Sequence, residues 1–257
     1  MTQTPEDVTP ATQPTSTRDD LIDTVRTVAV GLTAAVLIQT LAFQPFTIPT
    51  ASMEPGLLIG DYLVVSKAAY GFSRASLPSN PPLPDGRLFG RLPERGDVVV
   101  FRRPSDPQDV WIKRVIGLPG DRVEVVGGQI IVNGASLPQR MLGPGLDLDQ
   151  PGRPVQQVEE RQADGRAYIT FDGGAGLAGD DRAPQTVPEG QLFVMGDNRD
   201  NSLDSRWSPD VGVGLLPVIN VIGKAEIVVA SWQPGAAIWK PWTWFKIRSG
   251  RLMQKIR

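Results

Sequence analysis

Residues 111–134 read WIKRVIGLPGDRVEVVGGQIIVNG, and this stretch decides the fold class. Its β-branched and apolar runs are broken by Gly, Pro and Asp, a pattern that is typical of short strands joined by turns. Gly127 and Gly128 can adopt the positive φ of a two-residue turn, which predicts a hairpin over VEVVGGQIIVNG. Similar runs occur in 61–71, 96–104, 166–171, 191–197 and 221–232. The sequence therefore predicts a mainly β protein with an antiparallel, barrel-like core.

The composition limits the classes of protein that the chain can belong to. Its 257 residues are enough for one sizeable core, and 27 glycines and 24 prolines suit many turns. The formal net charge is −2, so bulk charge offers no argument for nucleic-acid binding. Cysteine and histidine are both absent. Disulfides, thiol nucleophiles, Ser-His-Asp triads and most zinc sites are thereby excluded, and no cofactor or metal is predicted.

The N-terminal region predicts a tail followed by an anchor. Residues 1–17 are rich in Thr and Pro, which is typical of a disordered tail. Asp19 and Asp20 suit a helix N-terminus, and no charge occurs between Arg26 and Glu54. The uncharged stretch 27–48 would span about 33 Å as a helix, roughly one bilayer core. We therefore expect a transmembrane anchor over 18–45, in which Pro45 and Pro49 end the helix near Phe43.

Two alternatives to the anchor are a cleaved signal peptide and a buried core helix. A signal peptide usually has a shorter apolar region after a positive segment, whereas the residues before this run are net acidic. A core helix seldom has so long a run without charge. The same acidic flank means that loop charge does not orient the segment in a membrane.

The rest of the chain predicts a β core with insertions. Residues 46–133 and 187–234 form the two parts of the core, and loop-rich 134–186 is predicted to be an inserted cap subdomain; 74–95 is also loop-rich. Residues 235–257 form a C-terminal tail with three of the six tryptophans and several basic residues. Such a tail suits either a membrane interface or a solvated basic end, and both readings stay open.

A serine nucleophile in this chain needs a base other than histidine, and a neutral lysine is the usual substitute. Ser52 follows the apolar run directly, so it is either a linker residue or a nucleophile. Strand alternation places Lys113 on one face with Trp111 and Val115, whose apolar side chains would lower its pKa. Edge-strand lysines that block aggregation are a common alternative.

Two other lysines compete with Lys113. Lys224 lies in an apolar strand, but Glu226 is two residues on, on the same face, and should keep it charged. Lys67 could be a solvated strand end.

A polar segment, MGDNRDNSLDSRWSPDVGVG (195–214), is typical of tight turns in which side chains bond the backbone. It could simply be a solvated loop. The alternative is a fixed ion-pair network between arginines and aspartates, with Arg114, Arg199 and Arg206 facing Asp197, Asp200 and Asp204.

With these residues in view, the chain resembles the bacterial type I signal peptidases, membrane-bound endopeptidases that remove signal peptides from exported proteins. Four blocks match in the family's order: IPTASMEP (48–55), GDVVVFRRP (96–104), WIKRVIGLPGD (111–121) and GDNRDNSLDSR (196–206). The first block alone is weak, but the last two at a spacing of 75 residues are highly specific.

The resemblance implies a role for each matching residue. It makes Ser52 the nucleophile and Lys113 its general base, with the Ser52 N–H and the Thr50 hydroxyl forming the oxyanion hole. Many relatives have Ser where this chain has Thr50. Ser202 matches the residue that hydrogen-bonds and orients the lysine. The supporting pairs implied are Asp204 with Arg206 and Asp197 with Arg114. Gly56 replaces the family's usual Thr, at a position without a catalytic role.

The resemblance also implies substrate, partners and location. Substrates would be preproteins whose signal peptides carry small residues at −1 and −3, cleaved through an acyl-enzyme. Partners would be these signal peptides, the lipid bilayer and the secretion translocon, with no nucleic acid. The protein would lie in the inner (cytoplasmic) membrane as a single-pass protein, with its N-terminus cytoplasmic and its catalytic domain on the outer face.

Three alternatives remain. A conjugation-type processing peptidase would share the Ser/Lys chemistry and differ in substrate. A self-cleaving repressor needs a DNA-binding domain, which residues 1–20 cannot supply. An inactive membrane-anchored binding module is opposed by the joint presence of Ser52, Lys113 and Ser202.

Overall fold

The computed structural model describes residues 17–77, 80–84, 86–236 and 240–257. It divides into two compact units, 1–39 and 40–257. Helix α1 (Thr17–Leu41) begins with Asp19 and Asp20 in its first turn, where the helix dipole favours negative charge. The predicted tail 1–17 lies outside the described residues apart from Thr17, which begins the helix.

The structure thus contains a helix where the sequence predicts a membrane anchor. Within the described part of the chain, no helix has the length and apolar character needed to cross a bilayer. Five charged residues lie in the first half of α1: Arg18, Asp19, Asp20, Asp23 and Arg26. The helix ends at Leu41, close to the expected end near Phe43, and Phe43–Thr47 then forms strand β1. Proline is tolerated in this strand because β1 lies at the edge of its sheet.

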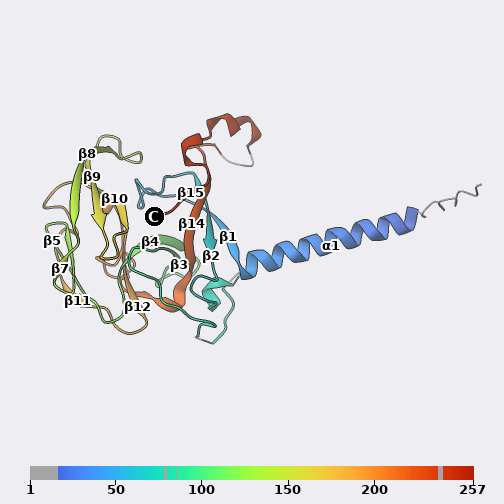
Figure 1. Cartoon of the computed structure of the whole chain (residues 1–257), viewed down its shortest axis with the longest axis horizontal. Coiled ribbons are helices and arrows are strands. Elements are labelled where there is room, and N and C mark those ends of the chain that lie inside the picture. Colours follow the sequence, from blue (N-terminus) through green and yellow to red (C-terminus); the bar gives the residue numbers. More distant parts are fainter. Residues whose placement is uncertain (1–16, 78–79, 85, 237–239) are drawn as a thin grey trace, which may run out of the picture. The chain divides into compact units, whose positions relative to one another are not determined.

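The second unit is built on one large antiparallel sheet of eight strands (Figure 1). Its order is β1, β2 (Asp61–Ser66), β14 (Val221–Ser231), β3 (Val98–Arg102), β4 (Val110–Gly117), β12 (Gln191–Met195) and β13 (Leu216–Pro217), while β15 (Gln254–Lys255) pairs with β14. In the described residues the end strands β1 and β13 do not pair with each other, so the sheet is open rather than a closed barrel.

Two smaller antiparallel sheets complete the unit. One has the order β11 (Arg182–Thr186), β5 (Arg122–Val126), β6 (Gln129–Val132) and β7 (Ala135–Ser136); the other has the order β10 (Ala167–Asp172), β9 (Pro154–Arg161) and β8 (Gln139–Leu146). The predicted hairpin is confirmed, since β5 pairs with β6 and Gly127 and Gly128 both have positive φ. The boundaries at 134 and 186 cut through the first of these sheets, because β7 and β11 pair with strands from 122–132.

Short 3-10 helices occur in the connections: η1 (Arg74–Ser76), η2 (Arg199–Asn201), η3 (Val218–Asn220), η4 (Pro241–Lys246) and η5 (Ser249–Arg251). Of these, η2 lies in the polar segment 195–214, and η5 lies in the C-terminal tail.

Neither expectation describes the whole of the C-terminal tail. Its second half packs on the main sheet, because β15 pairs with β14 at Ile227 and Val228. Its first half exposes Trp242, Trp244 and Phe245. Only this aromatic part keeps the character that the sequence indicated, while the remainder is a fixed element of the fold.

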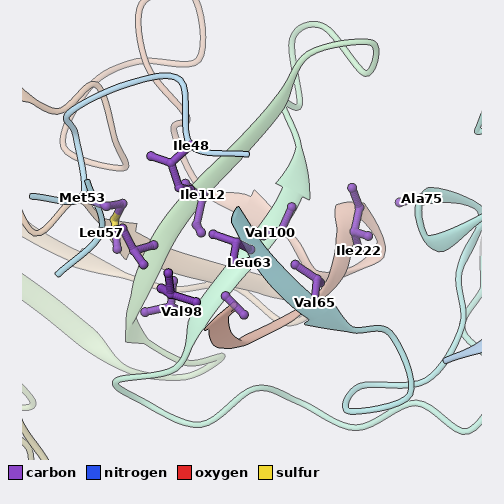
Figure 2. Packing of buried hydrophobic residues seen from close by; sticks show 12 residues of the cluster. Ile48, Met53, Leu57, Leu63, Val65, Ala75, Val98, Val100, Ile112 and Ile222 are labelled. Atoms are coloured by element: carbon purple, nitrogen blue, oxygen red, sulfur yellow. The ribbon is translucent and has the colours of Figure 1, made fainter. Parts of the chain in front are cut away.

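A buried cluster connects the main sheet to the turn that carries Ser52. Ile48, Met53 and Leu57 point from the turn toward the sheet, where Leu63 and Ile112 belong to the same cluster (Figure 2). Met53 is fully buried and Leu57 almost so. The apolar residues on either side of Ser52 therefore attach this turn to the core.

Replacing Leu63 by Ala should destabilise the protein by about 2–5 kcal/mol, because it leaves a cavity in this cluster. Denaturant unfolding of the purified protein measures the change. Leu88→Ala is a matched control, since Leu88 is 70% exposed and its loss should change the free energy of unfolding by less than about 0.5 kcal/mol. Equal transition midpoints for the two variants would contradict this account of the core.

Candidate active site

Ser52 lies on a turn that is closed by backbone hydrogen bonds. The Ile48 N–H donates to Asp61 O and the Gly60 N–H to Ile48 O, at 2.9 and 3.0 Å. These bonds join the two ends of 48–61, while Met53 and Leu57 hold its middle against the core. Ser52 is buried at the base of this turn. The serine is therefore held by its neighbours on both sides and is not a linker residue in the described structure.

Lys113 reaches Ser52 from strand β4, which lies between β3 and β12. Its Nζ is 2.8 Å from Ser52 Oγ and donates to the carbonyl of Ile112 at 2.9 Å. The Nζ also lies 5.4 Å from the centre of the Trp111 ring, the apolar neighbour that strand alternation predicts. Lys113 is thus a central-strand residue, and the edge-strand alternative is wrong.

Burial sets the protonation of Lys113. Its side chain is 3% exposed, and loss of solvation lowers its pKa to about 8 despite the opposing pull of Asp204 and Asp197. A lysine with this pKa has a substantial neutral fraction just above neutral pH. A neutral amine 2.8 Å from a hydroxyl can accept its proton.

Residues 196–206 of the polar segment 195–214 form a fixed network and not a solvated loop. The Asn198 N–H donates to Ser52 O at 3.1 Å, which ties this segment to the serine's own backbone. Asp204 accepts from the Gly196 N–H at 3.0 Å and from the Arg206 Nε at 2.9 Å. Burial alone would raise the pKa of Asp204, but the Arg206 charge and these hydrogen bonds hold it below its usual range.

Arg114 forms the second ion pair that the sequence indicated. Its Nε and Nη2 donate to the two carboxylate oxygens of Asp197 at 2.7 and 2.6 Å, and both side chains are buried. The Nη1 donates to Gly96 O at 2.7 Å. Arg114 follows Lys113 on β4, so this pair joins the lysine's strand to the polar segment.

The structure shows the surroundings of Ser202 and Thr50, the two other hydroxyl residues expected in the site. Ser202 is buried in the site, but its Oγ has no hydrogen-bond partner among the described residues. The predicted hydrogen bond that orients Lys113 is therefore not present, and the Ile112 carbonyl makes the corresponding contact. Thr50 is exposed and lines the cavity beside Ser52.

The two rival lysines are also located. Lys224 forms an ion pair with Asp97 at 2.7 Å, so its partner is Asp97 and not the predicted Glu226. The bulge in β14 after Ala225 breaks the simple alternation that pointed to Glu226. Lys67 is 1% exposed, so the expectation of a solvated strand end is wrong. Burial, with the nearby Arg102 charge, lowers its pKa.

Arg199 reveals a carboxylate that sequence reasoning missed. It pairs with both oxygens of the buried Glu160 on β9, not with Asp200. Glu160 also accepts from the Tyr168 hydroxyl at 2.9 Å, and the Arg114 guanidinium lies 3.8 Å from the centre of the Tyr168 ring. Glu160 lies two residues after Val158, on the same face of β9, and this position in the sequence could have predicted its burial.

A second missed group attaches the β8–β9 connection to the site. Asp147 is fully buried and accepts from the Arg153 Nη2 at 2.6 Å, while the same Arg153 nitrogen donates to Asn198 Oδ1 at 2.6 Å. Glu54, two residues after the serine, accepts from the Leu148 N–H at 3.0 Å. Burial raises the pKa of Glu54.

A cavity of about 620 Å³ opens at Ser52 and Lys113. Its lining includes apolar residues and carboxylates: Pro49, Ala51, Val110, Trp111, Ile112, Leu203 and Trp207, and Asp109, Asp149 and Asp200. Burial raises the pKa of Asp200. In the described parts of the chain, no group of three or more carboxylates is arranged to hold a metal ion.

Several known proteins are similar to this chain. A family model described as signal peptidase, peptidase S26, matches residues 21–232. Signal peptidase I of Rickettsia typhi and that of Rickettsia canadensis are each 40% identical to the chain over 202 residues, covering 76% of this chain and 74% of the relative. A crystal structure of signal peptidase I from Enterococcus faecalis is 29% identical, covers 52% of this chain and 97% of that one, and has a TM-score of 0.31.

The site and the sequence matches together define the class of protein, which is a serine endopeptidase. Within that class the chain belongs to the signal peptidase I family (peptidase S26), which cleaves signal peptides. Its substrates are accordingly preproteins, and the family is membrane-associated.

Gly196 provides a test of how tightly the site is packed. A Cβ at this position would lie 2.3 Å from Ser202 Oγ and 2.4 Å from Ser52 O, and both contacts are too close to persist without a shift of the site. Gly196→Ala should lower kcat/KM for preprotein cleavage by about 10²-fold, the cost expected for a displacement of about 1 Å in a site of this kind. Gly152→Ala is the control, because nothing lies within 4 Å of a Cβ there. Equal activity of the two variants would refute the packing argument.

Proposed function

We propose that Ser52 is the nucleophile and Lys113 the general base for cleavage of signal peptides after small residues at −1 and −3. The observation that carries the proposal is the 2.8 Å contact between Lys113 Nζ and Ser52 Oγ in a buried site. A pKa of about 8 for Lys113 supports the same assignment, since only the neutral amine can take the serine proton.

The reaction begins when the neutral Lys113 amine accepts the proton of Ser52 Oγ as this oxygen attacks the scissile carbonyl. A tetrahedral intermediate forms, and Lys113 then gives the proton to the leaving amine, which releases the mature protein. The signal peptide remains as an ester on Ser52. Water, deprotonated by Lys113, attacks this ester, and the peptide acid leaves as the serine recovers its proton.

The oxyanion of the intermediate would be stabilised by the Ser52 N–H and the Thr50 hydroxyl. Among the described residues, the Ser52 N–H is not engaged by another backbone acceptor, and Thr50 lies at the cavity wall. Donors of this kind contribute roughly 3–4 kcal/mol each where they have been measured. The apolar residues around the cavity, including Ala51, Ile112 and Leu203, suit small apolar side chains of a substrate.

Ser202 would act on the neutral form of Lys113. A neutral amine has two N–H groups and one lone pair; the lone pair faces Ser52, and one N–H is taken by Ile112 O. The second N–H needs an acceptor, and the unpartnered Ser202 Oγ lines the same cavity. Asp204 with Arg206 and Asp197 with Arg114 would hold the segment that carries this serine.

We also propose that residues 18–45 attach the protein to the inner membrane, with the N-terminus cytoplasmic and the catalytic unit on the outer face. The uncharged run 27–48 supports attachment, as do the exposed apolar side chains along α1, such as Leu32 and Val36. The exposed Trp242 and Phe245, with basic residues nearby in sequence, suit an additional lipid contact. The secretion translocon is a further proposed partner.

The proposal predicts that Ser52→Ala and Lys113→Ala each abolish cleavage of a preprotein with an A-x-A site. The general-base term alone should be worth roughly 10²- to 10⁴-fold. Purified variants are incubated with the preprotein, and the cut site is read by mass spectrometry. Lys224→Ala is the matched strand-lysine control and should keep cleavage within a few fold. Near wild-type activity of Lys113→Ala would remove the lysine from the mechanism.

The same experiment separates the alternatives. A cut after the A-x-A site supports signal-peptide processing, a cut elsewhere supports a processing peptidase of another specificity, and no cut with intact binding supports an inactive binding module.

The pH profile tests the protonation state. Because the charged Lys113 cannot accept a proton, kcat/KM should rise about tenfold per pH unit below its pKa and level off above about pH 8. Initial rates between pH 5 and 10, each followed by a return to pH 8 to check for inactivation, measure this limb. A rate that stays flat from acid to alkaline pH would contradict a neutral-lysine base.

A further inference from the structure

The last eleven residues that follow the aromatic part of the tail, 247–257, lie against the turn that carries Ser52. We call this segment the C-terminal strap. Arg251 of the strap donates from Nε and Nη2 to the two carboxylate oxygens of Asp61, at 3.1 and 2.5 Å. The same Nη2 donates to Gly56 O at 2.8 Å. One guanidinium therefore holds both the end of the 48–61 turn and a point four residues after the serine.

A second arginine of the strap adds to this attachment. Arg248 Nη1 donates to Ile59 O at 2.9 Å, to Trp232 O at 2.8 Å and to Ser231 Oγ at 3.0 Å. Ile59 belongs to the serine turn, whereas Ser231 ends strand β14. Arg248 thus bridges the turn to the main sheet.

The far end of the strap reaches the strand of Lys113. The Ile256 N–H donates to Glu226 O at 2.9 Å, and the Ile256 side chain packs on the cluster that contains Met53 and Leu57. Arg114, the residue after Lys113, donates from Nη1 to the main-chain oxygen of Arg257 at 2.8 Å. The strap consequently contacts both elements that the proposed Ser/Lys pair comes from.

We propose that the C-terminal strap sets the spacing of Ser52 and Lys113, and that Arg251 is a positioning residue for signal-peptide cleavage. The inference rests on the proposed function in that it takes Ser52 and Lys113 as the reacting pair. Arg251 does not line the cavity beside Ser52, so its effect passes through the turn and not through substrate.

The burial of Asp61 explains why Arg251 is the decisive contact. Asp61 is fully buried, and the Arg251 side chain is only 15% exposed. Asp61 Oδ2 also accepts from the Leu58 N–H at 2.8 Å, so the carboxylate itself is part of the turn. Without Arg251 this buried charge loses its counter-ion, and the turn must rearrange to bring it toward water.

The test compares Arg251→Ala with Lys246→Ala, which removes an exposed positive charge from the adjoining tail. Arg251→Ala should lower kcat for preprotein cleavage by about 10- to 100-fold, the range expected when a reacting group shifts by up to about 1 Å. KM should stay within about threefold, because Arg251 itself is not part of the cavity wall. Lys246→Ala should match the wild type in both constants.

Two further measurements distinguish positioning from loss of structure. Guanidinium ion at millimolar concentration should partly restore kcat of Arg251→Ala and leave Lys246→Ala unchanged. The acid limb of the pH profile should move to higher pH in Arg251→Ala. A loosened turn lets water reach Lys113, and solvation favours its charged form. Asp61→Asn keeps the hydrogen-bond acceptor while removing the charge, and its effect should not add to that of Arg251→Ala.

The outcomes bear separately on the two proposals. A kcat of Arg251→Ala within twofold of Lys246→Ala overturns the strap proposal, as does a loss that is fully accounted for by the unfolded fraction measured by circular dichroism. An effect on KM alone also overturns it. Retained cleavage in Ser52→Ala or Lys113→Ala would instead overturn the proposed function. A rescued, kcat-specific loss with inactive Ser52→Ala and Lys113→Ala supports both.

Discussion

The cost of burying the Lys113 amine is the constraint on which the rest of the site depends. An ammonium group that is 3% exposed loses most of its hydration, which lowers its pKa to about 8. Neutrality is what the proposed base requires, yet a buried amine still needs hydrogen-bond partners. Ile112 O and Ser52 Oγ meet this need at 2.9 and 2.8 Å. The same burial that disfavours the charge therefore also holds the amine against the serine.

Ion pairs around the amine have to be arranged so that they do not undo this effect. Asp204 and Asp197 lie near enough to favour the charged lysine, and each is paired with an arginine, Arg206 or Arg114. Those pairs neutralise most of the carboxylate charge, and the Asp197–Arg114 pair also ties 196–206 to β4. Glu160 on β9 and Arg199 form a further buried ion pair in this network. Because Asp204 and Asp197 are paired with arginines, they favour the charged form of Lys113 less than unpaired carboxylates would.

Local patterns in the sequence predict the parts of this structure that depend on neighbouring residues. Alternation about Lys113 predicts its apolar partner Trp111, and Gly127-Gly128 predicts the hairpin. Local patterns do not predict burial or ion-pair partners that depend on a distant segment of the chain. Lys67 is buried, Lys224 pairs with Asp97, and Arg199 takes Glu160, 39 residues earlier, in preference to the adjacent Asp200. A strand at Phe43–Thr47 is missed because pairing with β2 outweighs the effect of Pro45. Roles implied for Thr50 and Ser202 rest on resemblance, since their side chains leave no local signature.

The bond from Lys113 Nζ to the carbonyl of Ile112 has a consequence for how such a site can assemble. The amine is oriented by the peptide unit immediately before it, so part of its alignment is complete as soon as β4 forms between β3 and β12. The serine turn, held by the C-terminal strap, must then arrive from elsewhere in the chain. The lysine needs no remote carboxylate to align it, whereas the histidine base of a Ser-His-Asp triad does. Ser52 and Lys113 are 61 residues apart in the sequence, so their contact depends on the packing of the turn against the strand.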